Sequence, residues 1–108
     1  MDQKQEDYEY SGRPAPQAVE AEVFFLGGVM LDPNVLSDVV SLLDPDDFFQ
    51  ERHKVIWEAL QKLAQFNTPI DVVTLSNALE KENKLESAGG REYLLNLIES
   101  VASGANAH

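Results

Sequence analysis

Apolar residues recur every three or four positions from about residue 17 onward, which is the period of an α-helix with one buried face. Five such runs predict five helices, at about residues 17–30, 33–43, 51–66, 72–82 and 90–101. We expect Val35 to face inward in the second helix, and Phe66 to end the apolar stripe of the third. No stretch shows the sustained period-two alternation of a strand. The pattern predicts an all-α fold, a compact globular bundle of five to six short helices.

Two of the predicted helices begin with residues that commonly cap helices. Asp32 precedes Pro33 in the way that an N-cap residue precedes a proline at the first helical position. Asp71 is in the N-cap position of the fourth helix, where Ile70 and Leu75 have the spacing of a hydrophobic staple. These local signals favour helix starts at residues 33 and 72.

Glycine and asparagine mark the other boundaries. Asn83 is suited to a left-handed C-cap after the fourth helix, and the turn before the last helix contains Gly89 and Gly90. Gly27 and Gly28 lie inside the first helix, where the pair costs about 2 kcal/mol in helix propensity relative to alanine. We interpret this pair as a site where another helix crosses closely.

The acidic turn at residues 44–47 raises the question of a calcium site. In an EF-hand loop starting at Asp44, Phe48, Phe49 and Val55 would stand where an oxygen ligand, a glycine and a glutamate are required. The match fails, so we interpret the segment as a solvated turn followed by two large apolar anchors, Phe48 and Phe49.

A candidate interaction surface is suggested by aromatic residues beside the main apolar stripes. Phe24 and Phe25 flank the stripe of the first helix, and Trp57 stands just off that of the third. Either they complete the core of a small domain, or one of them is exposed and marks a protein-binding patch. Asp46 and Asp47 are the acidic neighbours that we assign to the same candidate surface.

Composition narrows the classes of function. The 108 residues hold 8 Lys and Arg against 19 Asp and Glu, no cysteine, and a net charge of −11. Residues 1–16 have two basic and four acidic residues and few apolar ones, so we expect a disordered acidic tail with −2, which leaves −9 on residues 17–108. This charge disfavours tight binding to nucleic acid. The absence of an export signal or membrane-spanning run predicts a cytoplasmic protein.

No residue pattern indicates catalysis. None of the lysines is followed by Ser or Thr, so the chain lacks a P-loop. His53 has acidic neighbours in the sequence, but the second histidine is at position 108, too isolated for a histidine-rich metal site. We expect His53 to pack at a helix start and to hydrogen-bond the preceding turn. A small enzyme or metal-binding domain around His53 stays open as an alternative, as does an acidic adaptor or DNA mimic.

Several motifs occur together and in order: PQAVEAEVFFLGGVMLD, DDFF, His53-x-x-Ile56, TPID-x-x-TL, AGG-x-x-YL-x-x-L and Ala105-Asn106. In this arrangement the chain resembles the N-terminal domain of DnaB-type bacterial replicative DNA helicases. The positions that match the family pattern are Glu20, Glu22, Leu26, Gly27, Gly28, Phe48, His53, Ile56, Ile70, Asp71, Leu75, Gly89, Gly90, Tyr93 and Leu94. The resemblance implies that these residues serve the architecture of a helical head domain, 17–108, with no catalytic, cofactor or metal site.

The resemblance also implies partners. Heads of this family form the collar of a hexameric ring as a trimer of dimers, and they dock the helicase-binding domain of primase. A helicase loader is a further expected partner. ATP and magnesium are expected in a separate ATPase domain, absent here together with the helical hairpin through which heads pair. We therefore expect a monomer or weak dimer. Ala102 departs from the family, where many relatives carry proline.

Overall fold

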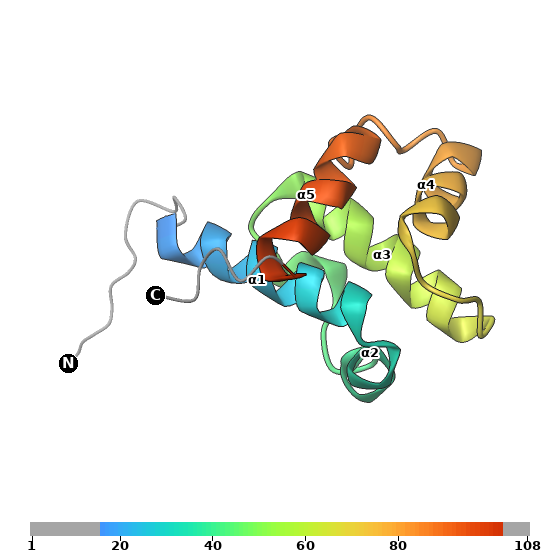
Figure 1. The fold of residues 1–108 in the computed structure, drawn as a ribbon, viewed down its shortest axis with the longest axis horizontal. Helices are drawn as coiled ribbons and strands as arrows, with labels where there is room; N and C mark the ends of the chain where they lie inside the picture. The colour runs from blue at the N-terminus through green and yellow to red at the C-terminus, as the bar shows by residue number, and fades with distance from the viewer. Residues whose placement is uncertain (1–15, 103–108) are drawn as a thin grey trace.

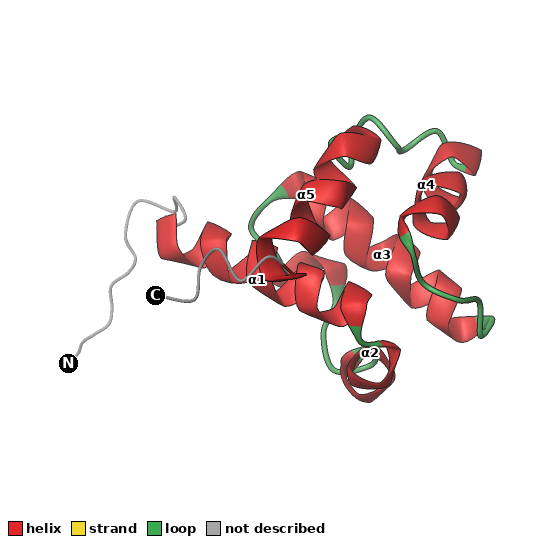
Figure 2. Cartoon of the chain, in the orientation of Figure 1, coloured by secondary structure: helices red, strands yellow, loops and turns green. Residues whose placement is uncertain are grey.

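A computed structural model of the chain describes residues 16–102. Within this range it has five α-helices, one 3-10 turn and no strand (Figures 1 and 2). The elements are α1 (Pro16–Leu31), α2 (Pro33–Val39), η2 (Pro45–Asp47), α3 (Glu51–Gln65), α4 (Val72–Lys81) and α5 (Gly90–Ala102). The all-α prediction is confirmed. The expected acidic tail lies outside the described residues, except for Pro16, which begins α1.

The helices pack in layers around one core. Helix α5 lies along α1, while α3 contacts α1 and also packs against α4 (Figure 1). Helix α2 follows directly from the C-terminal end of α1, and η2 lies against α3. The fully buried large side chains are Trp57, Leu26, Ile56, Leu60, Leu75, Leu79, Leu94 and Leu97. Every long helix therefore contributes its apolar stripe to a shared interior, as the periodicity predicts.

Three apolar residues predicted to face inward are exposed. Phe66 is 72% exposed, Phe49 is 59% exposed, and Val35 also faces solvent. Phe66 is the C-cap residue of α3, where the chain leaves the helix and turns away from the stripe. Of the two predicted anchors after the acidic turn, only Phe48 is buried, because successive residues in extended backbone point to opposite sides.

Helix α2 is shorter than predicted, since it ends at Val39 rather than near residue 43. Val39, Val40 and Ser41 are poor helix formers. The side-chain amide of Gln61 on α3 donates to the carbonyls of Val40 and Leu43, at 3.1 and 3.0 Å. These bonds satisfy the backbone of the turn that replaces the last part of the predicted helix.

The predicted helix starts are confirmed. The Asp32 carboxylate accepts hydrogen bonds from the backbone N–H groups of Asn34 and Val35, with Pro33 at the first position of α2. At α4, the Asp71 carboxylate accepts from the Thr74 N–H at 2.8 Å, and the Thr74 hydroxyl accepts from the Asp71 N–H at 3.0 Å. The two residues form a reciprocal capping box.

The predicted left-handed positions are also confirmed. Asn83 has φ 60° directly after α4, while Gly89 and Gly90 have φ 101° and 82° before α5. A side chain on Gly89 would meet the ring of Tyr93, so this turn requires glycine for space as well as for conformation. Asn67, at φ 55°, ends α3 in the same way.

Of the two adjacent glycines in α1, only one lies at a helix crossing. A Cβ on Gly27 would lie 2.2 Å from the carbonyl oxygen of Leu97 and 2.8 Å from the Val101 side chain, so α5 crosses there in backbone contact. A Cβ on Gly28 would meet nothing within 4 Å. The predicted close approach is confirmed for Gly27 and wrong for Gly28, which lies on the outer side of α1.

Candidate interaction surface

A buried histidine joins three helices that are far apart in the sequence. The His53 ring, in the first turn of α3, is 0% exposed. Its Nδ1 is 2.7 Å from the Glu22 carboxylate on α1, and its Nε2 is 2.6 Å from the hydroxyl of Tyr93 on α5. The backbone N–H of His53 donates to the Gln50 carbonyl at 3.0 Å, as a bond to the preceding turn predicts, but the ring makes no such bond, because these two side chains occupy both ring nitrogens.

The Glu22 carboxylate also caps the start of α3. It accepts hydrogen bonds from the backbone N–H of Phe49 at 2.7 Å and from that of Gln50 at 3.5 Å. These N–H groups precede the first helical turn, where unpaired donors and the helix dipole favour a negative charge. Glu22 thus binds the preceding turn that His53 was expected to bind.

The two ring nitrogens have different partners in this network. The geometry fits the tautomer in which Nδ1–H of His53 donates to the Glu22 carboxylate and Nε2 accepts the Tyr93 O–H. Burial raises the pKa of the Tyr93 hydroxyl, although the nearby Arg52 guanidinium, which lies 4.6 Å from the centre of the Tyr93 ring, acts in the opposite direction. Since both ring nitrogens of His53 are satisfied internally, the geometry favours a structural role over catalysis or metal binding.

Metal coordination finds no support elsewhere in residues 16–102. Within this range no group of three or more His, Asp or Glu side chains is placed to hold a metal ion. The same residues include no helix long and apolar enough to cross a membrane.

An apolar groove runs between α1 and the segment around η2. Six residues line this α1–η2 groove, namely Ala21, Glu22, Phe25, Leu43, Asp47 and Phe48. Its volume is about 150 Å³, comparable to an engineered protein cavity that binds benzene. Four of the six residues are apolar, and the other two, Glu22 and Asp47, are acidic.

The groove is backed by a rigid aromatic cluster. The Phe25 and Phe48 ring centres are both 5.6 Å from that of Trp57 and 6.2 Å from each other, in tilted contacts. The Trp57 indole N–H donates to the Leu43 carbonyl at 3.0 Å, which holds the η2 side of the groove against α3. The groove is therefore preformed by packing.

The residues predicted to form the candidate surface differ in how exposed they are. Phe24 is 51% exposed on α1, Phe25 is partly buried and lines the groove, and Asp46 and Asp47 are exposed. Trp57 is 0% exposed, so the interpretation that it completes the core is confirmed and its assignment to the candidate surface is wrong. The indole lies beneath Phe25 and Phe48, where it supports the groove from below.

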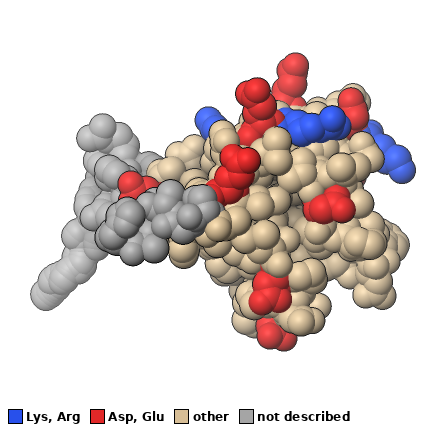
Figure 3. All heavy atoms as spheres, in the orientation of Figure 1, with Lys and Arg blue, Asp and Glu red and all other residues tan. Residues whose placement is uncertain are grey.

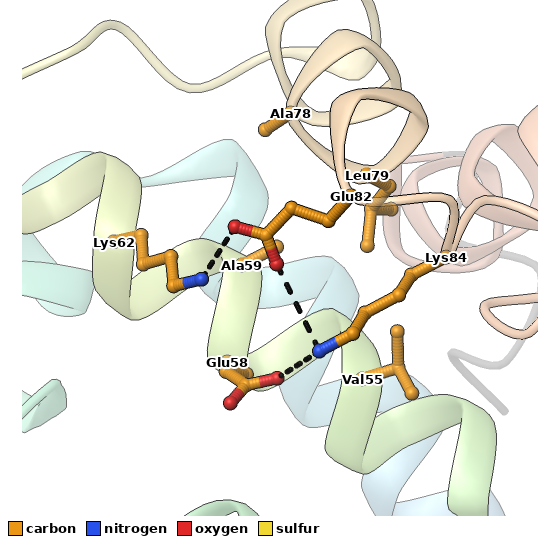
Figure 4. A pocket seen from close by; sticks show the side chains of 8 residues that line it. All are labelled: Val55, Glu58, Ala59, Lys62, Ala78, Leu79, Glu82 and Lys84. Atoms are coloured by element: carbon orange, nitrogen blue, oxygen red, sulfur yellow. Dashed lines mark hydrogen bonds and ion pairs between the residues drawn. The ribbon is translucent and has the colours of Figure 1, made fainter.

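A chain of opposite charges joins α3 to the end of α4. Glu82 pairs with Lys62, and Lys84 lies between Glu58 at 3.1 Å and Glu82 at 3.8 Å (Figure 4). The bond from Lys62 lowers the pKa of Glu82, and the Glu58 carboxylate raises that of Lys84. The paired residues are 20 and 26 positions apart in the sequence, so no short sequence pattern predicts these ion pairs. The four charges neutralise one another, so this cluster is suited to holding α3 against α4.

Charge is divided sharply between the two halves of the described chain. Residues 16–51 contain eight acidic residues and no Lys or Arg, whereas residues 52–102 contain seven acidic and six basic residues. In Figure 3 the visible basic side chains lie along the upper part of the molecule, among acidic ones, and the charges visible around α2, at the bottom, are all acidic. The α1–η2 groove lies in the half without basic residues.

Comparisons with known proteins agree with the motifs. The family described as "DnaB-like helicase N terminal domain" matches residues 14–108. Replicative DNA helicase DnaB of Geobacillus stearothermophilus is 38% identical over 97 residues, covering 90% of this chain and 21% of the relative. The DnaB of Buchnera aphidicola subsp. Acyrthosiphon pisum is 43% identical over 88 residues, covering 82% of this chain and 19% of the relative. The chain thus spans about a fifth of the length of these relatives.

A solved structure extends the similarity to the fold. The crystal structure of the N-terminal domain of DnaB helicase from Mycobacterium tuberculosis superposes with a TM-score of 0.73 at 35% identity. The match covers 87% of this chain and 67% of that one. The similarity is to the N-terminal domain of these helicases.

Proposed function

Because the chain belongs to the DnaB-like helicase N-terminal domain family, we propose that it serves as a collar domain in a hexameric replicative helicase, stabilising the ring and docking primase. In this proposal the chain is an interaction module. ATP and magnesium are used by an ATPase domain of the whole helicase, since this sequence has no P-loop lysine.

The observation that carries the proposal is an apolar stripe on the outer side of α1. Phe24 and Leu31 are both about half exposed, and Gly28 lies between them at helical spacing. Aromatic and aliphatic side chains that flank a glycine allow another helix to approach closely. We assign this stripe to contact with a neighbouring head in the ring.

Calorimetric titration of this chain with the helicase-binding domain of primase tests the docking role. We expect saturable binding of the primase domain to the chain. Failure of the primase domain to bind the chain, under conditions where it binds the whole helicase, would overturn that part of the proposal.

Sedimentation of the whole helicase tests the collar role. We expect the pair of changes Phe24→Ser and Leu31→Ser to shift the hexamer toward smaller species. Val73→Ser, at an exposed apolar residue of α4, is the matched control and should leave the hexamer intact. An unchanged hexamer in the double variant would contradict the assignment of the stripe.

A further inference from the structure

We propose that the α1–η2 groove binds a basic amphipathic helix of a partner protein, one large apolar side chain entering the groove and Lys or Arg side chains lying against its acidic rim. The inference deepens the proposed function by naming a docking face and the chemistry of its partner, and it rests on the domain being an interaction module.

The shape of the groove fits a single apolar side chain. Ala21 and Phe25 on α1 face Leu43 and Phe48 across a hollow of about 150 Å³. The small side chain of Ala21 leaves this hollow open to solvent. Partner helices commonly insert apolar side chains into grooves of this kind.

The groove is ready to bind without rearrangement. Trp57 packs beneath both Phe25 and Phe48, and its hydrogen bond to the Leu43 carbonyl fixes the opposite wall. Preformed pockets reduce the entropy cost of binding, since fewer side chains must be ordered.

The negative charge around the groove indicates that the partner is basic. The Glu22 carboxylate in the lining is already bound by His53 and by the Phe49 N–H, so the acids open to a partner are Asp47 on the rim and the exposed Asp46 beside it. Lys54 lies 3.9 Å from Asp46. Residues 16–51 contain no Lys or Arg, so an acidic or nucleic-acid partner would be repelled. A partner with basic residues beside its apolar stripe is therefore attracted to the acids next to the groove, Asp46 and Asp47.

The test is an NMR titration of this chain with a synthetic amphipathic helical peptide that has a leucine stripe flanked by lysines. We expect shift changes centred on the groove and binding that weakens between about 50 and about 500 mM NaCl, as screening predicts. The same peptide with glutamate in place of lysine should bind at least about tenfold more weakly.

Two variants localise the binding. Ala21→Arg fills the groove and adds positive charge at an exposed helical position, and Asp46→Lys reverses the charge beside the rim. Each should weaken binding of the lysine peptide by about tenfold or more. Asn96→Arg and Glu99→Lys make the same charge changes on exposed positions of α5, which does not line the groove, and should leave binding unchanged. Circular dichroism checks that each variant is folded.

The outcomes separate this inference from the proposed function. Equal binding of both peptides, or equal binding by the groove and control variants, overturns the groove assignment even if primase binds the chain. Peptide binding lost selectively in the groove variants supports it even if the primase domain fails to bind, a result that would count against primase docking alone.

Discussion

At the scale of single residues, His53 illustrates how tertiary packing assigns a role that local sequence leaves open. Its ring is surrounded in the sequence by acids, yet its bonds go to Glu22 and Tyr93, which are 31 and 40 residues away. All three residues match the family pattern, which implied architecture for them. The structure supplies the reason, since one histidine on α3 bonds polar side chains of two other helices, α1 and α5.

Replacing His53 by alanine should strongly destabilise the fold. The change leaves the Glu22 carboxylate and the Tyr93 hydroxyl without a shared partner in a buried site, and removes a packed ring. We expect the free energy of unfolding to fall by about 3 kcal/mol, measured by urea denaturation. Lys81→Ala, on the exposed side of α4, is the control and should change it by less than about 0.5 kcal/mol. If His53→Ala lowered the free energy of unfolding as little as Lys81→Ala, the stabilising role of the network would be contradicted.

Tyr93 should make stability depend on alkaline pH. Burial raises its pKa in the folded chain above the ordinary 10.0. Below pH 10 the hydroxyl is protonated in both states and its contribution is fully present. As pH rises further, the unfolded chain loses the proton first, so the free energy of unfolding falls until folded Tyr93 ionises too.

Chemical denaturation at a series of pH values between 8 and about 11.5 would measure this effect. Tyr93→Phe should lose stability less steeply over that range than the unchanged chain, because phenylalanine cannot ionise. Parallel pH profiles for the two proteins would show that Tyr93 is not responsible.

At the scale of elements, the crossing of α1 and α5 depends on one glycine of an adjacent pair. Sequence reasoning identifies both Gly27 and Gly28 as costly inside a helix, but it cannot tell which side of α1 meets another backbone. The answer depends on the rotation of α1 about its axis, which is set by its buried partners Leu26, Val29 and Met30. Only the folded arrangement of several helices specifies that rotation.

Alanine substitutions at the two glycines should have opposite effects. Gly27→Ala places a methyl group 2.2 Å from the Leu97 carbonyl oxygen and should force the helices apart, at a cost of about 2 kcal/mol. Gly28→Ala meets open space and should raise the free energy of unfolding by about 0.5–1 kcal/mol through better helix propensity. Thermal unfolding of the matched pair measures both changes. The same sign for both variants would contradict the crossing geometry.

At the scale of the whole molecule, the dominant electrostatic feature is an uneven distribution of charge. The half that includes α1, α2 and η2 has no basic residue of its own, so its eight acids repel one another, with Lys54 of the other half 3.9 Å from Asp46. The other half is almost balanced and contains the α3–α4 ion pairs. Because exposed ion pairs contribute little, we expect repulsion to dominate the response to salt.

Moderate salt should therefore stabilise the chain. Raising NaCl from about 10 to about 150 mM shortens the Debye length from about 30 to about 8 Å and screens the acidic half. We expect the free energy of unfolding to increase over this range, measured by urea denaturation at each concentration. A decrease would mean that the ion pairs joining α3 to α4 outweigh the repulsion.

The features that the sequence determines by itself are local ones. Helix periodicity, the Asp32 and Asp71 caps, and the left-handed Asn83 depend on groups within a few residues of one another, so the same interactions form wherever the chain lies. The uneven charge is likewise readable from composition. These signals predicted the all-α fold and most of its boundaries, and the ordered motifs indicated the family.

The tertiary structure alone decided what each exposed or polar side chain does. The burial of Trp57, the exposure of Phe49 and Phe66, the partners of His53 and the existence of the α1–η2 groove all depend on elements distant in the sequence. A helical stripe shows which residues share a face, but the neighbour that covers the face is chosen by packing over the whole chain. That choice buries Trp57 behind the two phenylalanines that line the groove rather than leaving it on the surface.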